Sequence, residues 1–326
     1  GAIYLMPERK FTALLVLLVI SAFIFSISGC QQPAKKPPAK PVKMASEVKK
    51  YNKEPGISLY RTATGAKQQL KMEEYLKGVL AAEMNPKFPM EALKAQAIVA
   101  RTMTLALLEY ENGTRAKHGT DASDNHLEFQ QYDEKKITDN ISRAVDETKG
   151  QVLTYQGKFV YTMFHSLSKD KTASMAEGFP KLASKASYLV PVSTHGIKYA
   201  PAKYRSWTVK VPRWEIKNLM GSKAGNLDDI RVSKRGPSGR ATMLTAGSAS
   251  IKAVDLRQQI GPDRLYSTVW SSVKPEGNYI VFKGSGWGHG VGMEQWGAYA
   301  LAKEGKTARQ IVEHYFPNTA WTQLYK

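Results

Sequence analysis

Glu83 lies at the end of a predicted helix, in the largely apolar segment VLAAEMNP (residues 79–86). Partial burial raises the pKa of a carboxyl group, so such a group holds a proton near neutral pH and can act as a general acid. The alternative is a helix-terminal glutamate that points into solvent. Three other glutamates stand nearby in the sequence, and the local composition alone does not separate Glu83 from them.

Three polar residues of the next predicted helix form a second candidate group. Lys94 and Arg101 are seven residues apart, so they share one face of a helix at a distance of two turns, and Gln96 stands between them in the sequence. This group could orient a polar substrate. The alternatives are that Arg101 pairs with a carboxylate and that Lys94 is a solvated surface cation.

His165 and Ser166 follow a predicted strand, with Ser168 and Thr172 downstream. A serine nucleophile needs a neighbouring base and an orienting acid. The G-x-S-x-G turn is absent, and the spacing between His165 and Ser168 is not diagnostic. We therefore do not expect a serine hydrolase.

Residues 284–297 (GSGWGHGVGMEQWG) contain six glycines among fourteen residues. Such a composition indicates backbone conformations that other residues avoid, and a close approach of the main chain to another group. Trp287 and Trp296 offer flat apolar faces for sugar rings, while His289 and Gln295 offer hydrogen bonds. The alternative is a tightly packed turn whose tryptophans fill the core. Nucleotide binding is unsupported, because the segment lacks both the Gly-Lys-Ser/Thr ending and the G-x-G-x-x-G frame.

Helices and strands must position these candidate groups. Apolar periodicity predicts helices over residues 72–84 and 90–110, separated by a break that contains two prolines. Residues 57–64 are strand-like, and residues 151–164 predict a hairpin with a Gln-Gly pair at its turn. The expected fold class is α+β: a mixed, β-rich domain with a helical segment that carries the candidate acid.

Composition limits the classes of partner. The chain has 326 residues, of which 42% are apolar, and this is enough for a substantial core. Its net charge of +19 at pH 7 favours anionic partners such as nucleic acid, phosphate-rich polymers or membrane surfaces. The single cysteine, Cys30, excludes an internal disulfide framework and a multi-cysteine metal site.

The N-terminal region predicts export. Residues 11–29 are uncharged and apolar, and two basic residues precede them. Cys30 then follows small residues, as in a bacterial lipobox, so we expect residues 1–30 to be a lipoprotein signal with Cys30 lipidated; a signal anchor is the alternative. Either one tethers the protein to the extracytoplasmic face of the cell membrane, which excludes nucleic acid as a partner. Residues 31–56, rich in Pro and Lys, predict a linker to a folded domain over residues 57–326.

Four segments, taken in order, resemble one protein family. They are EEYLKGVLAAEMNPKFPMEALKAQAIVARTMTLALLEY, FHSLSKDKTA, RGPSGRATML and GSGWGHGVGMEQWGAYALAKEGKTARQIVEHYFPNTAWTQL. This pattern closely resembles the SpoIID/LytB-domain family, that is, stage II sporulation protein D and its relatives, from about residue 57 to residue 324. The family includes lytic transglycosylases, which cut the MurNAc-GlcNAc β-1,4 bond of peptidoglycan and leave 1,6-anhydro-MurNAc ends. It also includes amidase enhancers.

The resemblance implies roles for the candidate residues. Glu83 matches the catalytic glutamate in the family motif GV-x-A-x-EM, and Arg101 matches a motif arginine that would orient the substrate or Glu83. The expected substrate-binding residues are Arg101, Lys94, Gln96, His165, Ser166, Trp287, His289, Gln295 and Trp296. The implied substrate is peptidoglycan whose stem peptides an amidase has removed, during septal remodelling in sporulation and engulfment. An N-acetylmuramoyl-L-alanine amidase and a membrane anchor protein are implied partners, and a non-catalytic, glycan-binding amidase enhancer is the alternative function.

One departure from the family concerns zinc. Some members bind zinc through Cys and His residues in a segment ending C-Q-x-Y, and residues 118–132 correspond to it here. Ser123 and Phe129 stand where those members have cysteines, so we expect neither zinc nor another cofactor. His118, Asp121 and His126 could hold a metal weakly, although three ligands spread along a loop are more typical of surface polar groups.

Two further departures concern charged residues. Lys169 and Asp170 replace a Gly-Gly pair that is typical of the family, which changes the expected shape of that loop. Glu294 stands where a serine is common. We expect it to be a surface carboxylate, and the alternative is a second functional acid.

Overall fold

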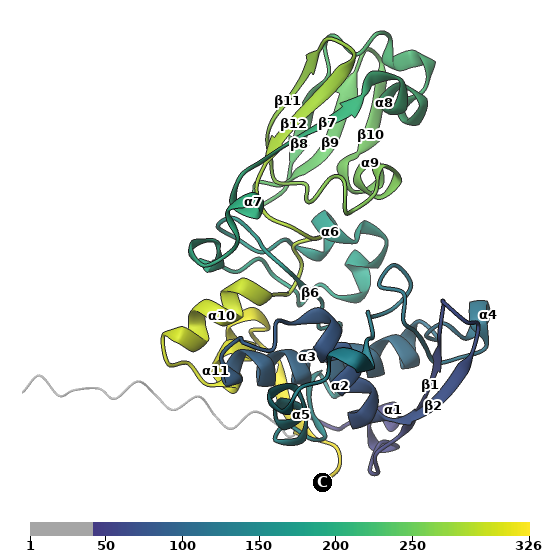
Figure 1. Cartoon of the computed structure of the whole chain (residues 1–326), viewed down its shortest axis with the longest axis vertical. Helices are drawn as coiled ribbons and strands as arrows, with labels where there is room; N and C mark the ends of the chain where they lie inside the picture. Colours follow the sequence, from purple (N-terminus) through teal and green to yellow (C-terminus); the bar gives the residue numbers. More distant parts are fainter. Residues whose placement is uncertain (1–41) are drawn as a thin grey trace, which may run out of the picture. The chain divides into compact units, whose positions relative to one another are not determined.

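The computed structural model of the chain describes residues 42–326, which form one compact unit (Figure 1). The predicted signal or anchor, Cys30 and the first part of the predicted linker lie outside the described residues. Export, lipidation and tethering therefore stay predictions. Within residues 42–326, no helix combines the length and the apolar character needed to cross a membrane.

Two consecutive helices carry the candidate acid and the core of the larger part of the unit. They are α2 (Met72–Glu83) and α3 (Met90–Tyr110), which confirms the two predicted helices. Helix α2 ends because Met84 adopts an extended conformation, and Pro89 precedes the first turn of α3. Small buried residues along α3 let neighbouring helices approach closely, so α2, α5 (Asp139–Asp146), α10 (Gln295–Lys303) and α11 (Ala308–Tyr315) all pack against it.

Short strands surround these helices in three small sheets. The first sheet has the order β2-β1-β3, the second β14-β4-β5, and the third pairs β13 with β6. Their bounds are β1 (Gly56–Tyr60), β2 (Lys67–Lys71), β3 (Ala122–Ser123), β4 (Gln151–Tyr155), β5 (Lys158–Phe159), β6 (Phe164–His165), β13 (Met293–Glu294) and β14 (Ala320–Gln323). The short helices here are α1 (Ser46–Lys49), α4 (Arg115–His118), η1 (Glu134–Lys136), α6 (Met175–Gly178), η2 (Pro180–Lys185), η3 (Gly196–Lys198) and α7 (Ala202–Arg205).

The predicted hairpin is present, with a shorter second strand than the prediction. Strands β4 and β5 pair antiparallel, and their turn uses positive φ angles of 50° at Gln156 and 78° at Gly157. The carbonyl of Gly157 accepts a hydrogen bond from the N–H of Ala45, and nearby Val48 is buried in the core. The compact unit therefore begins at about residue 42, earlier than the boundary expected at residue 57.

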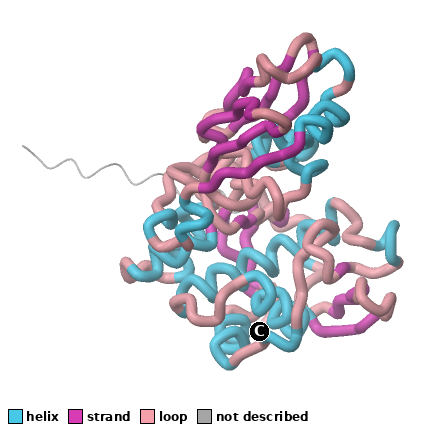
Figure 2. The backbone as a smooth tube through the Cα atoms, turned by 45° about the horizontal axis from the view of Figure 1, so that its top comes forward, coloured by secondary structure: helices cyan, strands magenta, loops and turns pink. Residues whose placement is uncertain are grey.

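A β-rich segment between α7 and the glycine-rich residues has its own hydrophobic core. Two three-stranded sheets, β10-β9-β8 and β11-β12-β7, pack with two helices, and Figure 2 shows these strands gathered in one part of the molecule. The bounds are β7 (Trp207–Pro212), α8 (Arg213–Met220), η4 (Ser222–Ala224), β8 (Arg231–Arg235), β9 (Ala241–Ala246), β10 (Ala249–Lys252), α9 (Ala253–Ile260), β11 (Trp270–Glu276) and β12 (Tyr279–Gly284). The expected α+β class is confirmed.

The glycine-rich segment returns the chain to the helical part, and its glycines make room for the protein's own backbone. Strand β13 pairs in parallel with β6, and isolated bridges join Leu167 to Trp287 and Ala173 to Val291. At Gly292, with φ +74°, a Cβ atom would lie 1.9 Å from the carbonyl oxygen of Met163. Gly286 and Gly288 likewise approach Leu167 and His165, so these three glycines make the expected close approach to residues 163–167.

Candidate active site

Glu83 lies at a cleft of about 810 Å³ whose walls come from distant parts of the sequence. One wall comes from α3 and residues 126–131, another from residues 163–182 and the glycine-rich segment, and a third from α9 and the loop after it. Six of the predicted binding residues line this cleft: His165, Ser166, Trp287, His289, Gln295 and Trp296. A second hollow, of about 580 Å³, shares Glu83 and its sequence neighbours with the cleft.

The environment of Glu83 suits a proton donor. Its side chain is partly exposed at the cleft, and the surrounding protein otherwise removes the carboxyl from water. This desolvation raises the pKa of Glu83 to about 7, and the backbone N–H of Gln131, which donates to the carboxyl at 3.2 Å, offsets only part of the effect. The side chain of Gln295 donates to the carbonyl oxygen of Glu83 at 3.2 Å, which ties the glycine-rich segment to the end of α2.

Both tryptophans of the glycine-rich segment are half-buried in the walls of the cleft. Trp287 stacks on Tyr204 with ring centroids 4.4 Å apart. Trp296 packs against Phe88 and Tyr299, at centroid distances of 4.8 and 5.5 Å. Each tryptophan thus has protein on one side and the cleft on another, which is the position that a sugar platform requires.

The two cleft histidines are held neutral. Burial lowers the pKa of His165 well below its usual value and that of His289 to about 3. The Nδ1 atom of His165 donates to the carbonyl of Val291 (3.2 Å), so its Nε2 accepts from the hydroxyl of Ser168 (2.7 Å). Ser168 is completely buried, so it cannot reach a substrate.

The predicted group on α3 does not line the cleft. Arg101 is completely buried and forms an ion pair with Glu73, at 2.5 Å between Nη2 and Oε2. Lys94 pairs with Glu147 at 2.5 Å, and Gln96 is buried with no hydrogen-bond partner among the described residues. The shared face of Lys94 and Arg101 packs toward α5. Arg101 therefore pairs with a carboxylate, as its alternative allowed, and Lys94 forms a partly exposed surface ion pair.

Glu294 is buried, so its expected surface position is wrong. One carboxylate oxygen accepts from the backbone N–H of Ser168 at 2.9 Å, and the other accepts from the hydroxyl of Thr194. Burial raises the pKa of Glu294 to about 7. It lies directly before Gln295, beneath the floor of the cleft, and it does not line the cleft itself.

The side chains of the segment that carries zinc in some relatives do not suit zinc here. His118 is bonded through Nε2 to the carboxylate of Glu128 at 2.7 Å, and Lys117 pairs with the same carboxylate. Asp121 accepts from the backbone N–H of Ser58 at 2.9 Å. Ser123 and Phe129 offer no thiolate, and His126 is exposed on the cleft wall. His118 and Asp121 are thus engaged by other residues, and among the described residues no three such side chains gather to hold a metal ion, so the set does not fit a closed zinc site.

Two further regions contact residues of the cleft wall: the loop that contains Lys169 and Asp170, and the β-rich segment. Both members of the pair are exposed, and the Asp170 carbonyl accepts from the N–H of Thr194 at 2.9 Å. Arg240 is completely buried and donates to the hydroxyl of Ser168 at 3.1 Å. Neither Arg240 nor the α9 wall, which includes Arg257, was predicted as part of the site. Both come from the β-rich segment, and only the tertiary structure brings that segment to the cleft.

Comparison with known proteins adds family membership. The family model "Stage II sporulation protein" matches residues 60–155, and a model for a domain of unknown function matches residues 182–292. Stage II sporulation protein D of Bacillus amyloliquefaciens is 31% identical over 273 residues, which cover 80% of this chain and 76% of that protein. Its counterpart in Bacillus subtilis is 32% identical over 280 residues (81% and 78%). The amidase enhancer of Bacillus subtilis is 26% identical over 294 residues, or 76% of this chain and 40% of that protein. The chain belongs to the stage II sporulation protein D family.

Proposed function

We propose that this protein is a lytic transglycosylase of peptidoglycan. Its main substrate is a glycan strand whose stem peptides have been removed, and its products end in 1,6-anhydro-MurNAc. The observation that carries the proposal is the partly exposed carboxyl of Glu83, with a pKa of about 7, in a cleft that also contains two half-buried tryptophans.

In this mechanism Glu83 acts first as an acid and then as a base. Its protonated carboxyl donates to the glycosidic oxygen, and the bond from that oxygen to C1 of MurNAc breaks. The resulting carboxylate then takes the proton from the C6 hydroxyl of the same MurNAc, whose oxygen attacks C1. The nucleophile belongs to the held sugar ring, so the second step gains from proximity and requires no added water.

The other cleft carboxylates favour this route over hydrolysis. A hydrolysing glycosidase needs a second carboxylate beside the scissile bond, as nucleophile or base. Among the cleft-lining residues, Glu128 is engaged by Lys117 and His118, and Asp263 is exposed on the loop after α9. Glu294 lies beneath the cleft surface. Glu83 is thus the only lining carboxyl with a raised pKa among the described residues.

The cellular setting belongs to the same proposal. The sporulation names of the relatives support a role in remodelling the septal wall during engulfment. The apolar residues 11–29 support tethering to the extracytoplasmic face, by lipidation of Cys30 or by a signal anchor. An N-acetylmuramoyl-L-alanine amidase is the partner that would prepare the substrate, and a membrane anchor protein is a second partner. Similarity to an amidase enhancer keeps a non-catalytic role as the second candidate function.

Mass spectrometry of digested glycan strands tests the proposal. Peptidoglycan with and without amidase treatment is incubated with the full chain, with Glu83→Gln, and with Glu74→Gln as a control, since Glu74 is exposed on the same helix. We expect anhydro ends from the wild type and the control and none from Glu83→Gln. Reducing ends would mean hydrolysis, and glycan binding without products from any variant would favour the amidase-enhancing role.

A further inference from the structure

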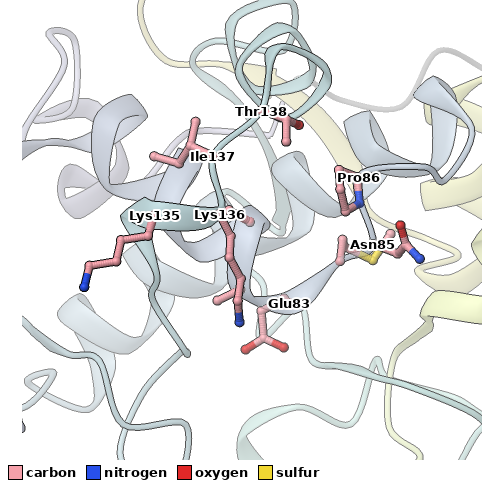
Figure 3. Close-up of a pocket in the computed structure, with 10 residues that line it drawn as sticks. Glu83, Asn85, Pro86, Lys135, Lys136, Ile137 and Thr138 are labelled. Carbon is pink, nitrogen blue, oxygen red and sulfur yellow. The ribbon is translucent and has the colours of Figure 1, made fainter.

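The second hollow beside Glu83 carries two lysines. Figure 3 shows Lys135 and Lys136, from the short helix η1, on one side of this hollow and the end of α2 with the following residues on the other. Its volume is about 580 Å³. Its other lining residues are Ala81, Ala82, Met84, Asn85, Pro86, Ile137 and Thr138. Glu83 is the one carboxyl group in this lining.

Helix η1 is fixed in place against α2. The backbone N–H of Asp133 donates to the carbonyl of Gly78 at 3.0 Å. A Cβ atom at Gly78 would lie 2.1 Å from the ring of Tyr132, so the glycine lets this ring, just before η1, pack onto the helix. On the other side of the hollow, the amide of Asn140 donates to the carbonyl of Pro86 at 3.3 Å. Both walls are therefore anchored, so the backbone of Lys135 and Lys136 has a defined location beside the end of α2, and both lysine side chains are exposed.

The nearby acidic side chains do not neutralise both lysines. Glu134 is engaged by Arg61 at 2.8 Å. Lys136 has Asp133 at 3.3 Å, an exposed contact of little strength, and Lys135 has no ion-pair partner within residues 42–326. When the Glu83 carboxyl holds its proton, the lysines are the only charged groups that line the hollow. Figure 3 shows the ammonium group of Lys136 directed towards Glu83 and that of Lys135 directed to the outer side of the hollow. Positive charge beside an acid that must be protonated favours an anionic substituent on the bound sugar.

We propose that this hollow is an anion subsite in which Lys135 and Lys136 bind the free lactyl carboxylate of MurNAc. This inference rests on the proposed function. The lactyl group is attached to the same ring whose C1 is attacked, so it must lie close to Glu83. A stem peptide converts this carboxylate to a neutral amide, and removal of the peptide restores the charge. The subsite thus gives a physical reason for selecting peptide-stripped strands.

Carboxylates also occur within stem peptides, and the test must separate these two sources. Binding is measured with the inactive Glu83→Gln chain, so that it does not depend on turnover. The three ligands are peptide-stripped strands, the same strands with their lactyl carboxylates converted to methylamides, and peptide-bearing strands. Lys135→Gln/Lys136→Gln is compared with Lys303→Gln/Lys306→Gln, which removes the same charge from exposed lysines outside both hollows.

We expect Lys135→Gln/Lys136→Gln to weaken binding of peptide-stripped strands about five- to tenfold, as for two partly exposed charge-assisted contacts, and to leave binding of the methylamide strands unchanged. The control should change neither by more than about twofold. An equal loss for stripped and methylamide strands, or no loss, overturns the subsite. A loss confined to peptide-bearing strands overturns the lactyl assignment, because the lysines would then bind stem-peptide carboxylates. If the wild type releases no anhydro ends, the proposed function fails, while this binding result still decides the subsite.

Discussion

Replacing Arg101 with methionine separates an internal structural role from the substrate contact that the sequence suggested. Arg101 donates from Nε and Nη2 to the Glu73 carboxylate, and it also donates to the carbonyls of Gln151 (3.1 Å) and Val145 (3.3 Å). Removing one partner of a buried ion pair leaves an uncompensated charge and costs about 3–5 kcal/mol. Because domains are stable by only about 5–15 kcal/mol, this is a large fraction of the free energy of unfolding.

Urea unfolding followed by circular dichroism measures this cost. Lys94→Met is the matched control, because its pair with the exposed Glu147 is screened by solvent and should contribute little to stability. Below its unfolding transition, Arg101→Met should keep its rate of anhydro-product formation per folded molecule within about threefold of the wild type, since Arg101 does not line the cleft.

A double variant, Glu73→Leu/Arg101→Met, refines the interpretation. Removing both charges should restore part of the lost stability. Recovery should be incomplete, because Gly150 N–H and the Tyr325 hydroxyl lose Glu73 as an acceptor, at about 1 kcal/mol or more for each. If Arg101→Met instead costs less than about 1 kcal/mol while product formation falls a hundredfold, Arg101 acts on the substrate and our reasoning is refuted.

Three further predictions concern titration and packing. With a pKa of about 7 for Glu83, kcat/KM for anhydro-product formation should fall as pH rises through about 7, and a flat profile from pH 6 to 8 would contradict an acid role. The folded state also retains the protons of Glu294 and Glu83 up to pH about 7, whereas the unfolded state releases them near pH 4.5, so wild-type stability should decrease across this window. Glu294→Gln should reduce that slope by about half in urea titrations, and an unchanged slope would mean that Glu294 does not titrate there. Gly292→Ala should destabilise the fold by more than about 3 kcal/mol in thermal unfolding, because its Cβ would meet the carbonyl of Met163. The control Gly305→Ala, which also has a positive φ but has open space around it, should cost about 1 kcal/mol. Equal losses of stability would mean that the close approach at Gly292 is not the cause.

Local structure was predictable to a large extent. The apolar periodicity of residues 72–84 and 90–110 identified α2 and α3, because a 3.6-residue repeat specifies which face of a helix is buried. The turn of the β4–β5 hairpin was predicted from Gly157, because glycine tolerates the positive φ that such a turn requires. Glu83 was singled out from its neighbouring glutamates only by the family resemblance, because its apolar sequence neighbours left a solvent-exposed position open; burial in the structure raises its pKa.

The partners of polar side chains were decided by tertiary structure. Spacing placed Lys94 and Arg101 on one face, but it could not reveal that this face packs toward α5 or that Glu73 reaches Arg101. Glu294 looked like a surface carboxylate because its partner Thr194 stands 100 residues away in the sequence.

Tertiary structure also decided that α9 forms a wall of the cleft and that η1 is anchored beside Glu83. The repeat of apolar residues along one helix or strand shows which face of that element is buried, because the repeat lies within the element itself. The contact between two elements depends on the path of the chain between them, and no local repeat encodes that path. The sequence alone therefore indicated the family and predicted Glu83 as the candidate acid, and tertiary packing decided which charged side chains are internal and which line the cleft.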